Sequence, residues 1–182
     1  MTGKIISIIG PMYAGKSESL IRMINRYTIA KKKCLVVAHS SDNRYSSDHA
    51  LCTHSGIKVP ALKVDKLQGV DASKFDVIAV DEGQFFPDLI EFVDEWAKRG
   101  KIILVSALSA DYKMEPFPIV SRLLARSEKI MQITAVCSGC QKSASFTKKI
   151  NGDSAIVDVG GVDKYKATCR KCHLEFAEPV LS

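Results

Sequence analysis

Eight residues near the start of the chain have the types and spacing needed to bind phosphate: Gly10, Pro11, Met12, Tyr13, Ala14, Gly15, Lys16 and Ser17. In this G-x-x-x-x-G-K-S pattern, the glycines let backbone N–H groups converge on phosphate oxygens. Lys16 can reach the outer phosphates of a nucleotide, and Ser17 can coordinate Mg²⁺. A strand-like apolar run precedes the pattern and a helical pattern follows it, which is the context that a phosphate-binding loop requires.

A pair of acids, Asp81 and Glu82, follows the short apolar run 77–80. An apolar strand that ends in acids is typical of the Walker-B strand, whose carboxylate lies at the sheet edge beside the phosphate loop. We therefore expect Asp81 to hold Mg²⁺, usually through water. Glu82 would point elsewhere, and we favour it as a general base that activates a hydroxyl or a water. The alternative is that Glu82 only supports the metal electrostatically.

Two C-x-x-C pairs stand in the last third of the chain: Cys137, Cys140, Cys169 and Cys172. Two such pairs are a strong signal for a zinc ion with four thiolate ligands. A closed tetrahedral site leaves no coordination position for a substrate, so we expect a structural role. A redox dithiol is the alternative, although redox C-x-x-C motifs usually occur singly near a βαβ unit.

Length and composition restrict the remaining choices. The 182 residues suggest one domain or one domain with a small appendage, and a hydrophobic content of 46% can supply its core. The formal charge is +6, but Lys and Arg are spread along the chain rather than gathered in one patch. We find no apolar run of membrane-spanning length and no secretory signal, and with a nucleotide site this favours a cytoplasmic protein.

The elements that must position these residues alternate between strands and helices. Buried strands are predicted at 4–9, 34–38, 77–80, 101–108 and 129–136, and helices follow Ser17, Pro87 and Pro116. A phosphate loop that opens such an alternation specifies a parallel α/β sheet with ligands at the carboxyl ends of its strands. Residues 1–136 would form this nucleotide-binding domain, and residues 137–182 would form a zinc domain with short strands near 144–149 and 154–159.

Two weakly patterned stretches lie between these elements. The polar residues 39–56 are predicted to form a long loop, which either binds ligand or is only solvated. Within it, Arg44 could face a phosphate, and Asp42 could orient Arg44 or approach the metal. Residues 64–67 are predicted to form one helical turn.

Together these features resemble the type II thymidine kinases. The resemblance rests on residues 10–17, Asp-Asn-Arg-Tyr-Ser-Ser at 42–47, Cys-Thr-His at 52–54, Asp-Glu-Gly-Gln-Phe-Phe-Pro at 81–87, and Gly-Gly-Val-Asp-Lys-Tyr at 160–165 inside the Cys₄ module. It implies a RecA-like α/β domain, a small zinc domain with a lasso loop, and a homotetramer. It also implies phosphorylation of thymidine and deoxyuridine at the 5′-hydroxyl by Mg-ATP, feedback inhibition by dTTP, and no nucleic-acid or membrane partner.

Carried over position by position, the resemblance assigns roles to individual residues. Glu82 would take the proton from the thymidine 5′-hydroxyl. The ATP phosphates and Mg²⁺ would be held by residues 10–17 together with Asp42, Arg44, Asp81 and Gln84, with Ser17 and Asp81 at the metal. The nucleoside would be enclosed by apolar and aromatic residues and by the lasso backbone: Met12, Phe85, Leu108, Tyr112, Thr147, Ile156, Val157, Asp158, Val159, Gly160 and Tyr165.

The chain departs from the family pattern at two places. The family usually continues Asp-Gly-Thr-Phe-Gln-Arg-Lys-Pro-Phe where this chain has Ser-Ala-Asp-Tyr-Lys-Met-Glu-Pro-Phe at 109–117, and Ser19 stands where an acid is more common. The replacement of the family's Phe by Tyr112 is a mild change. The other replacements in 109–115 change both the shape and the charge of this loop. Two other interpretations are a catalytically impaired kinase-like subunit, favoured only by 109–115, and a zinc-ribbon nucleic-acid-binding ATPase. The ATPase would require a basic stripe with exposed aromatic residues, which the sequence does not show.

Overall fold

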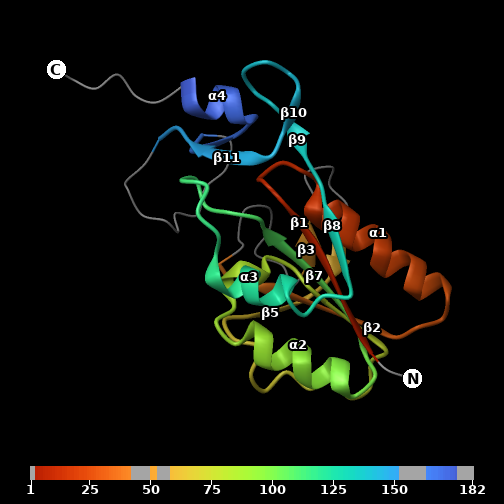
Figure 1. Ribbon diagram of the computed structural model, residues 1–182. Helices are drawn as coiled ribbons and strands as arrows, with labels where there is room; N and C mark the ends of the chain where they lie inside the picture. The colour runs from red at the N-terminus through yellow and green to blue at the C-terminus, as the bar shows by residue number, and fades with distance from the viewer. Residues whose placement is uncertain (1–2, 42–49, 53–57, 152–162, 176–182) are drawn as a thin grey trace.

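A six-stranded parallel sheet forms the centre of the larger of two lobes in the computed structural model (Figure 1). The structure describes residues 3–41, 50–52, 58–151 and 163–175. All neighbouring strands of the sheet pair in parallel. In spatial order the strands are β5 (Leu62–Val64), β2 (Cys34–His39), β6 (Val77–Val80), β7 (Ile102–Leu108), β1 (Lys4–Gly10) and β8 (Lys129–Gln132).

Helices cover both faces of this sheet because its strands are apolar on both sides. Helix α1 (Lys16–Ile29) packs Leu20, Ile21 and Ile24 against one face. Helix α2 (Leu89–Lys98) and helix α3 (Pro118–Leu124) pack against the other face, where Phe86 and Leu89 are fully buried. The predicted parallel α/β architecture is confirmed.

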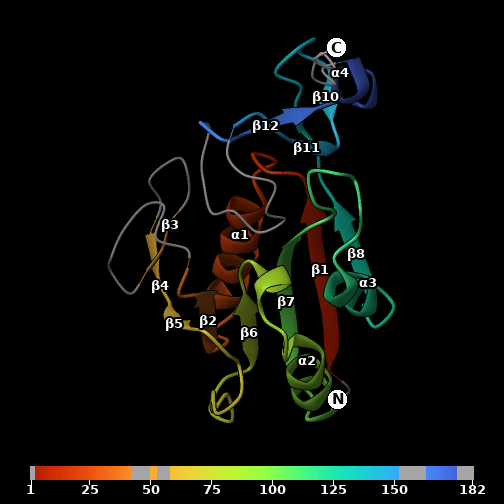
Figure 2. The same cartoon turned by 90° about the vertical axis from the view of Figure 1, so that its left-hand side faces the viewer.

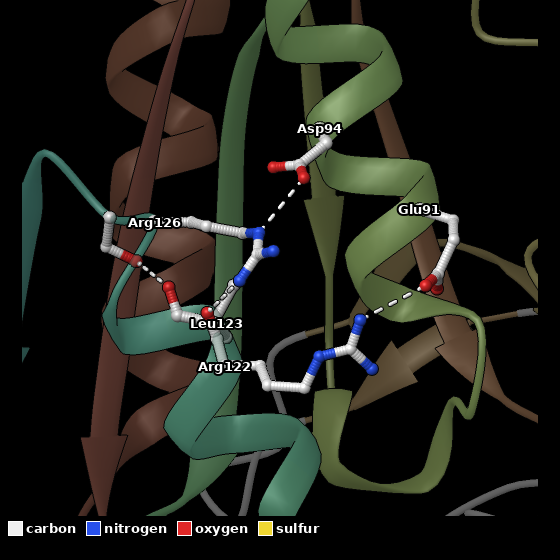
Figure 3. Close-up of polar contacts among 6 residues, drawn as sticks. Glu91, Asp94, Arg122, Leu123 and Arg126 are labelled. Atoms are coloured by element: carbon white, nitrogen blue, oxygen red, sulfur yellow. Dashed lines mark hydrogen bonds and ion pairs between the residues drawn. The ribbon is translucent and has the colours of Figure 1, made fainter.

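Helices α2 and α3 are also joined by ion pairs on the surface (Figure 3). Arg122 Nη2 donates to Glu91 Oε1 at 3.2 Å, and Arg126 Nε donates to Asp94 Oδ2 at 3.0 Å. Arg126 also donates to the Arg122 carbonyl at 3.1 Å, which fixes its guanidinium. Exposed pairs of this kind contribute on the order of 0–1 kcal/mol each, so burial of the apolar face holds these helices in place.

The small lobe lies at the carboxyl ends of the central strands (Figure 2). Its described residues form two short antiparallel pairs and a helix: β9 (Ala135–Val136) with β10 (Ser143–Ala144), β11 (Phe146–Lys149) with β12 (Tyr165–Thr168), and α4 (Arg170–Glu175). The predicted strand pieces near 144–149 are confirmed, whereas 154–159 lie outside the described residues. The division of the chain at residue 136 stays a prediction.

The predicted strand 129–136 is in fact two strands. Its first half, β8, pairs with β1, and Ile133 N still donates to Ile9 O at 2.9 Å. Strand β1 ends at Gly10, so the chain has no further partner there and passes into the small lobe, where Ala135 pairs with Ala144. The predicted helices are confirmed, but α2 begins at Leu89 and α3 at Pro118, two residues later than Pro87 and Pro116.

Two predictions for the weakly patterned stretches are wrong. The stretch 39–56 contains β3 (Ala50–Cys52), which pairs with β4 (Lys58–Pro60), because Leu51 is buried in the core on the α1 side of the sheet. Val64 ends β5 opposite His39 rather than starting a helical turn. Within the described ranges, no helix is both long and apolar enough to cross a membrane.

Candidate active site

The phosphate loop connects β1 to α1 and requires glycine at both ends. Gly15 adopts φ 77°, a left-handed conformation that glycine accepts without strain. Gly10 meets the end of the edge strand so closely that a Cβ there would lie 2.4 Å from the Ile133 carbonyl oxygen. The two glycines of the motif therefore serve different purposes, a turn at Gly15 and a close backbone approach at Gly10.

Two side chains at the start of α1 face the loop and the neighbouring strand. The Lys16 side chain is buried, and its Nζ donates to the Pro11 carbonyl at 2.8 Å. Ser17 Oγ donates to Asp81 Oδ2 at 3.0 Å. The structure thus brings together the phosphate loop and the acid at the end of β6, which are 64 residues apart in sequence.

Asp81 is almost completely buried, with 1% of its surface exposed. Its second carboxylate oxygen, Oδ1, accepts a hydrogen bond from Ser106 Oγ of β7. Its backbone N–H donates to Val37 O of β2 at 2.9 Å, which fixes the residue between two strands. The sequence analysis missed Ser106; the available signal was one polar residue inside the apolar run 101–108.

Glu82 is also buried and begins the short 3₁₀ helix η1 (Gly83–Phe85). Its φ of 54° is left-handed, which for a residue with a side chain costs about 1–3 kcal/mol. Gln84 Nε2 donates to Glu82 Oε2 at 2.5 Å, and Gln84 Oε1 accepts the Leu108 N–H at 3.0 Å. The Gln84 amide thus connects the Glu82 carboxylate to the end of β7 by hydrogen bonds. The predicted contact of Gln84 with phosphate stays a prediction.

The cysteine lobe contacts the phosphate loop directly. Thr147 Oγ1 of β11 accepts the Met12 N–H at 3.0 Å, and both residues are buried. Tyr13 and Ala14 pack against the apolar core of that lobe, which includes Cys137 and Cys172. Met12 and Thr147, which are both predicted to bind the nucleoside, are therefore in contact at the boundary between the lobes.

Other predicted nucleoside residues lie around the same boundary. Lys149 Nζ of β11 is 5.4 Å from the centre of the Tyr112 ring and 5.8 Å from the centre of the Tyr165 ring. Phe85 lies beside His39, a residue that the sequence analysis did not consider, with 5.6 Å between ring centres. The remaining predicted site residues lie outside the described residues: Asp42, Arg44, Ile156, Val157, Asp158, Val159 and Gly160.

The four cysteines of the two C-x-x-C pairs form a candidate metal centre. Their Sγ atoms all lie within 4.8 Å of one another, and Cys140 Sγ and Cys169 Sγ are 3.6 Å apart. Zinc–thiolate bonds of about 2.3 Å in a tetrahedron place sulfur atoms roughly 3.8 Å apart. The cluster therefore fits a zinc ion with four thiolate ligands and could bind it in a structural role.

Hydrogen bonding distinguishes two of these thiols. Backbone hydrogen bonds, first from Cys140 and then from Cys169, lower the pKa of Cys137 to about 6. The Cys169 N–H reaches Cys137 Sγ at 3.2 Å. A hydrogen bond with the Cys169 side chain and then burial raise the pKa of Cys172 to about 12. The hydrogen bonds within the cluster thus favour the thiolate form of Cys137 over that of Cys172, and metal binding releases the protons that the cluster still holds.

Comparison with known proteins gives a consistent result. A family model described as thymidine kinase matches residues 3–173. The thymidine kinase of Vaccinia virus (strain Western Reserve) is 43% identical over 175 residues, which cover 95% of this chain and 98% of the relative. The thymidine kinase of Monkeypox virus is 44% identical with the same coverage. The thymidine kinase of Yaba monkey tumor virus (strain VR587) is 43% identical over 176 residues, or 96% of each chain.

The zinc assignment predicts the effect of removing one ligand. In Cys169→Ser we expect loss of most bound zinc and a lower melting temperature, because the free energy of structural metal binding is folding free energy. Zinc per chain by elemental analysis and thermal unfolding measure both effects. Cys34→Ser is the matched control, because Cys34 lies beside α1 near Thr28 and outside the cluster. Full zinc retention by Cys169→Ser would contradict the Cys₄ assignment.

Proposed function

Because this chain belongs to the thymidine kinase family, we propose that it transfers the γ-phosphoryl group of Mg-ATP to the thymidine 5′-hydroxyl with Glu82 as the general base. The chain is a kinase that phosphorylates thymidine and uses ATP. The observation that carries the mechanism is the hydrogen bond from Ser17 to Asp81, because it joins the phosphate loop to the acidic strand end. Glu82 follows Asp81 directly and is therefore held at the same edge.

The phosphates and the metal would be bound by the phosphate loop and its acidic neighbour. Backbone N–H groups of residues 10–17 would hold the phosphate oxygens, and Lys16 would neutralise their charge. Ser17 and Asp81 would hold Mg²⁺, which supplies positive charge to the phosphate oxygens during transfer. Asp42 and Arg44 would complete this side of the site. Burial of Asp81 supports the proposal, since a buried carboxylate favours a cation beside it.

Glu82 would remove the proton from the attacking hydroxyl. A general base must be ionised and correctly oriented before the substrate arrives. The amide of Gln84 favours both conditions, because a donor at 2.5 Å stabilises the charged form of Glu82 and fixes one of its oxygens. The other oxygen would then accept the proton from the 5′-hydroxyl.

The nucleoside would bind between the lobes. The proposed pocket combines apolar and aromatic side chains with the main chain of the lasso: Met12, Phe85, Leu108, Tyr112, Thr147, Tyr165 and residues 156–160. An apolar and aromatic enclosure suits a flat pyrimidine with a methyl group. The hydrogen bond from Met12 N to Thr147 supports this placement, because it brings the pocket residues of one lobe to the phosphate loop of the other.

Further properties are proposed from the resemblance to the family. They are acceptance of deoxyuridine, assembly as a homotetramer, feedback inhibition by dTTP, and a cytoplasmic location without nucleic-acid or membrane partners. Family membership favours nucleoside phosphorylation over the nucleic-acid-binding ATPase. Two hydrogen bonds argue against a catalytically impaired subunit, because they hold the proposed site residues together: Ser17 with Asp81, and Gln84 with Glu82.

Initial rates with a panel of nucleosides at fixed Mg-ATP test this function. We expect phosphorylation of thymidine and deoxyuridine, and discrimination against deoxycytidine by a factor on the order of 10² in kcat/KM. Cytosine presents an amino donor where thymine presents the O4 acceptor, and a buried mismatch leaves polar groups unpaired. Comparable kcat/KM for deoxycytidine and thymidine would argue for a kinase of broader specificity.

The base is tested with Glu82→Gln. This change is nearly isosteric but cannot accept the proton, so we expect kcat to fall by a factor on the order of 10² or more, with ATP binding little changed. Glu91→Gln on the exposed surface of α2 is the matched control and should leave kcat unchanged. Activity of Glu82→Gln within a few-fold of the parent would exclude Glu82 as the base.

The role of Gln84 is tested with Gln84→Met, which keeps the length of the side chain but removes its donor. The Glu82 carboxylate then loses the hydrogen bond that orients it, so we expect kcat to fall by about tenfold while ATP binding changes little. Gln132→Met, on the exposed face of β8, is the control for the same substitution. An unchanged kcat in Gln84→Met would show that the amide does not orient the proposed base.

A further inference from the structure

The segment between β7 and α3, where the sequence departs from the family pattern, is a turn built around Asp111. The Asp111 carboxylate is buried, and its Oδ1 accepts the N–H groups of Lys113 at 2.8 Å and Glu115 at 2.9 Å. The backbone closes the same turn, since Asp111 N donates to Glu115 O at 2.9 Å and Met114 N donates to Asp111 O at 3.2 Å. A single ionisable side chain therefore holds the turn from inside, with hydrogen bonds of the strong, charge-assisted kind.

The turn reaches both lobes. At its start, Ser109 N donates to Gly10 O at 3.2 Å, which attaches it to the phosphate loop. At Tyr112 it meets the small lobe, where Lys149 Nζ of β11 lies 5.4 Å from the centre of the ring. Tyr112 is thus held from the large lobe through Asp111 and contacts Lys149 of the small lobe with its ring.

The contact made by Tyr112 continues into the proposed nucleoside pocket. Lys149 pairs with Tyr165 in the β11–β12 ladder, and its Nζ lies 5.8 Å from the centre of the Tyr165 ring. Thr147 stands two residues before Lys149, so both project from the same face of β11. A change in the position of Tyr112 would therefore displace Lys149 and, with it, Thr147 and Tyr165, two of the residues with which the small lobe is proposed to enclose the nucleoside.

We propose that Asp111 is a positioning residue, which holds Tyr112 so that the small lobe presents Thr147 and Tyr165 to the nucleoside in the productive geometry. This inference rests on the proposed function of the pocket. Asp111 does not act on the phosphates, so its loss should affect the nucleoside and spare ATP. The unusual sequence 109–115 then has a function of its own, because the carboxylate supplies the internal support of the turn.

Steady-state kinetics of Asp111→Ala, measured separately for thymidine and ATP, test the proposal. We expect the KM for thymidine to rise roughly tenfold, while kcat and the KM for ATP stay within about twofold. Asp111→Asn should raise the KM for thymidine less than Asp111→Ala does, because its Oδ1 can still accept both N–H groups, although without the charge. Asp71→Ala is the matched control, since Asp71 Oδ1 accepts Ser73 N at 2.9 Å in an exposed turn of the large lobe.

A double-mutant cycle tests whether the effect passes through Tyr112. In the background of Lys149→Met, the contact between Tyr112 and β11 is weakened, so adding Asp111→Ala should raise the thymidine KM further by less than twofold. If the increases in thymidine KM caused by Asp111→Ala and Lys149→Met multiply fully, Asp111 does not act through Tyr112 and the proposal is overturned. Equal increases in KM for thymidine and ATP would also overturn it. A KM of Asp111→Asn that matches Asp111→Ala would also overturn it.

Hydrogen exchange separates this proposal from the proposed function. In the zinc-loaded parent, the Lys113 and Glu115 amides should exchange slowly; Asp111→Ala should lose this protection and also speed exchange in β11 and β12. If the parent fails to phosphorylate thymidine, the proposed function is wrong, yet exchange still decides whether Asp111 orders the small lobe. Unchanged exchange in β11 and β12 in Asp111→Ala would overturn the positioning role.

Discussion

The two buried carboxylates at the end of β6 constrain the rest of the catalytic edge, because an ionised carboxylate inside a protein must be matched by donors or by a cation. Asp81 is matched by hydroxyl groups from α1 and β7, and Glu82 is matched by the amide of Gln84. These donors come from elements that only the parallel order of the sheet brings to one edge. Lys16 and the proposed Mg²⁺ add the positive charge that two adjacent acids require. The same residues that stabilise the acids are therefore those that prepare the site for phosphate.

The small lobe completes this edge rather than standing apart from it. Its core packs on Tyr13 and Ala14, and its Thr147 accepts a backbone N–H of the phosphate loop. Among the described residues, the buried part of this core consists of three alanines and two of the four clustered cysteines. A zinc ion bound by the cysteines would add to the stability of such a core. Zinc would thus influence the phosphate loop and the nucleoside pocket through folding, although the closed Cys₄ site offers no position to a substrate.

The sequence predicts best those features whose chemistry is local. Gly15 and Lys16 act within one turn of chain, and the cysteine spacing defines a metal site without reference to the fold. Ser106 was missed because a serine in an apolar strand becomes informative only when the next strand places Asp81 beside it. Strand β3 was missed because a single buried residue, Leu51, holds it in an otherwise polar stretch. The motif identified Gln84, but its bond to Glu82 depends on a side-chain orientation that only the folded edge determines.

Backbone strain suggests how rigid this edge is before ligands arrive. Left-handed φ values at residues with side chains occur at Tyr13, Glu82 and Met114, on three separate loops around the carboxyl ends of the strands. Such conformations cost about 1–3 kcal/mol each and persist only where surrounding contacts enforce them. Each of the three has such a contact: the small lobe packs on Tyr13, Gln84 holds Glu82, and Asp111 closes the turn that contains Met114. The catalytic loops are therefore fixed by contacts already present in the free protein. Nucleoside binding would then not have to order these three loops, which leaves binding energy available for orienting the 5′-hydroxyl toward the proposed base Glu82.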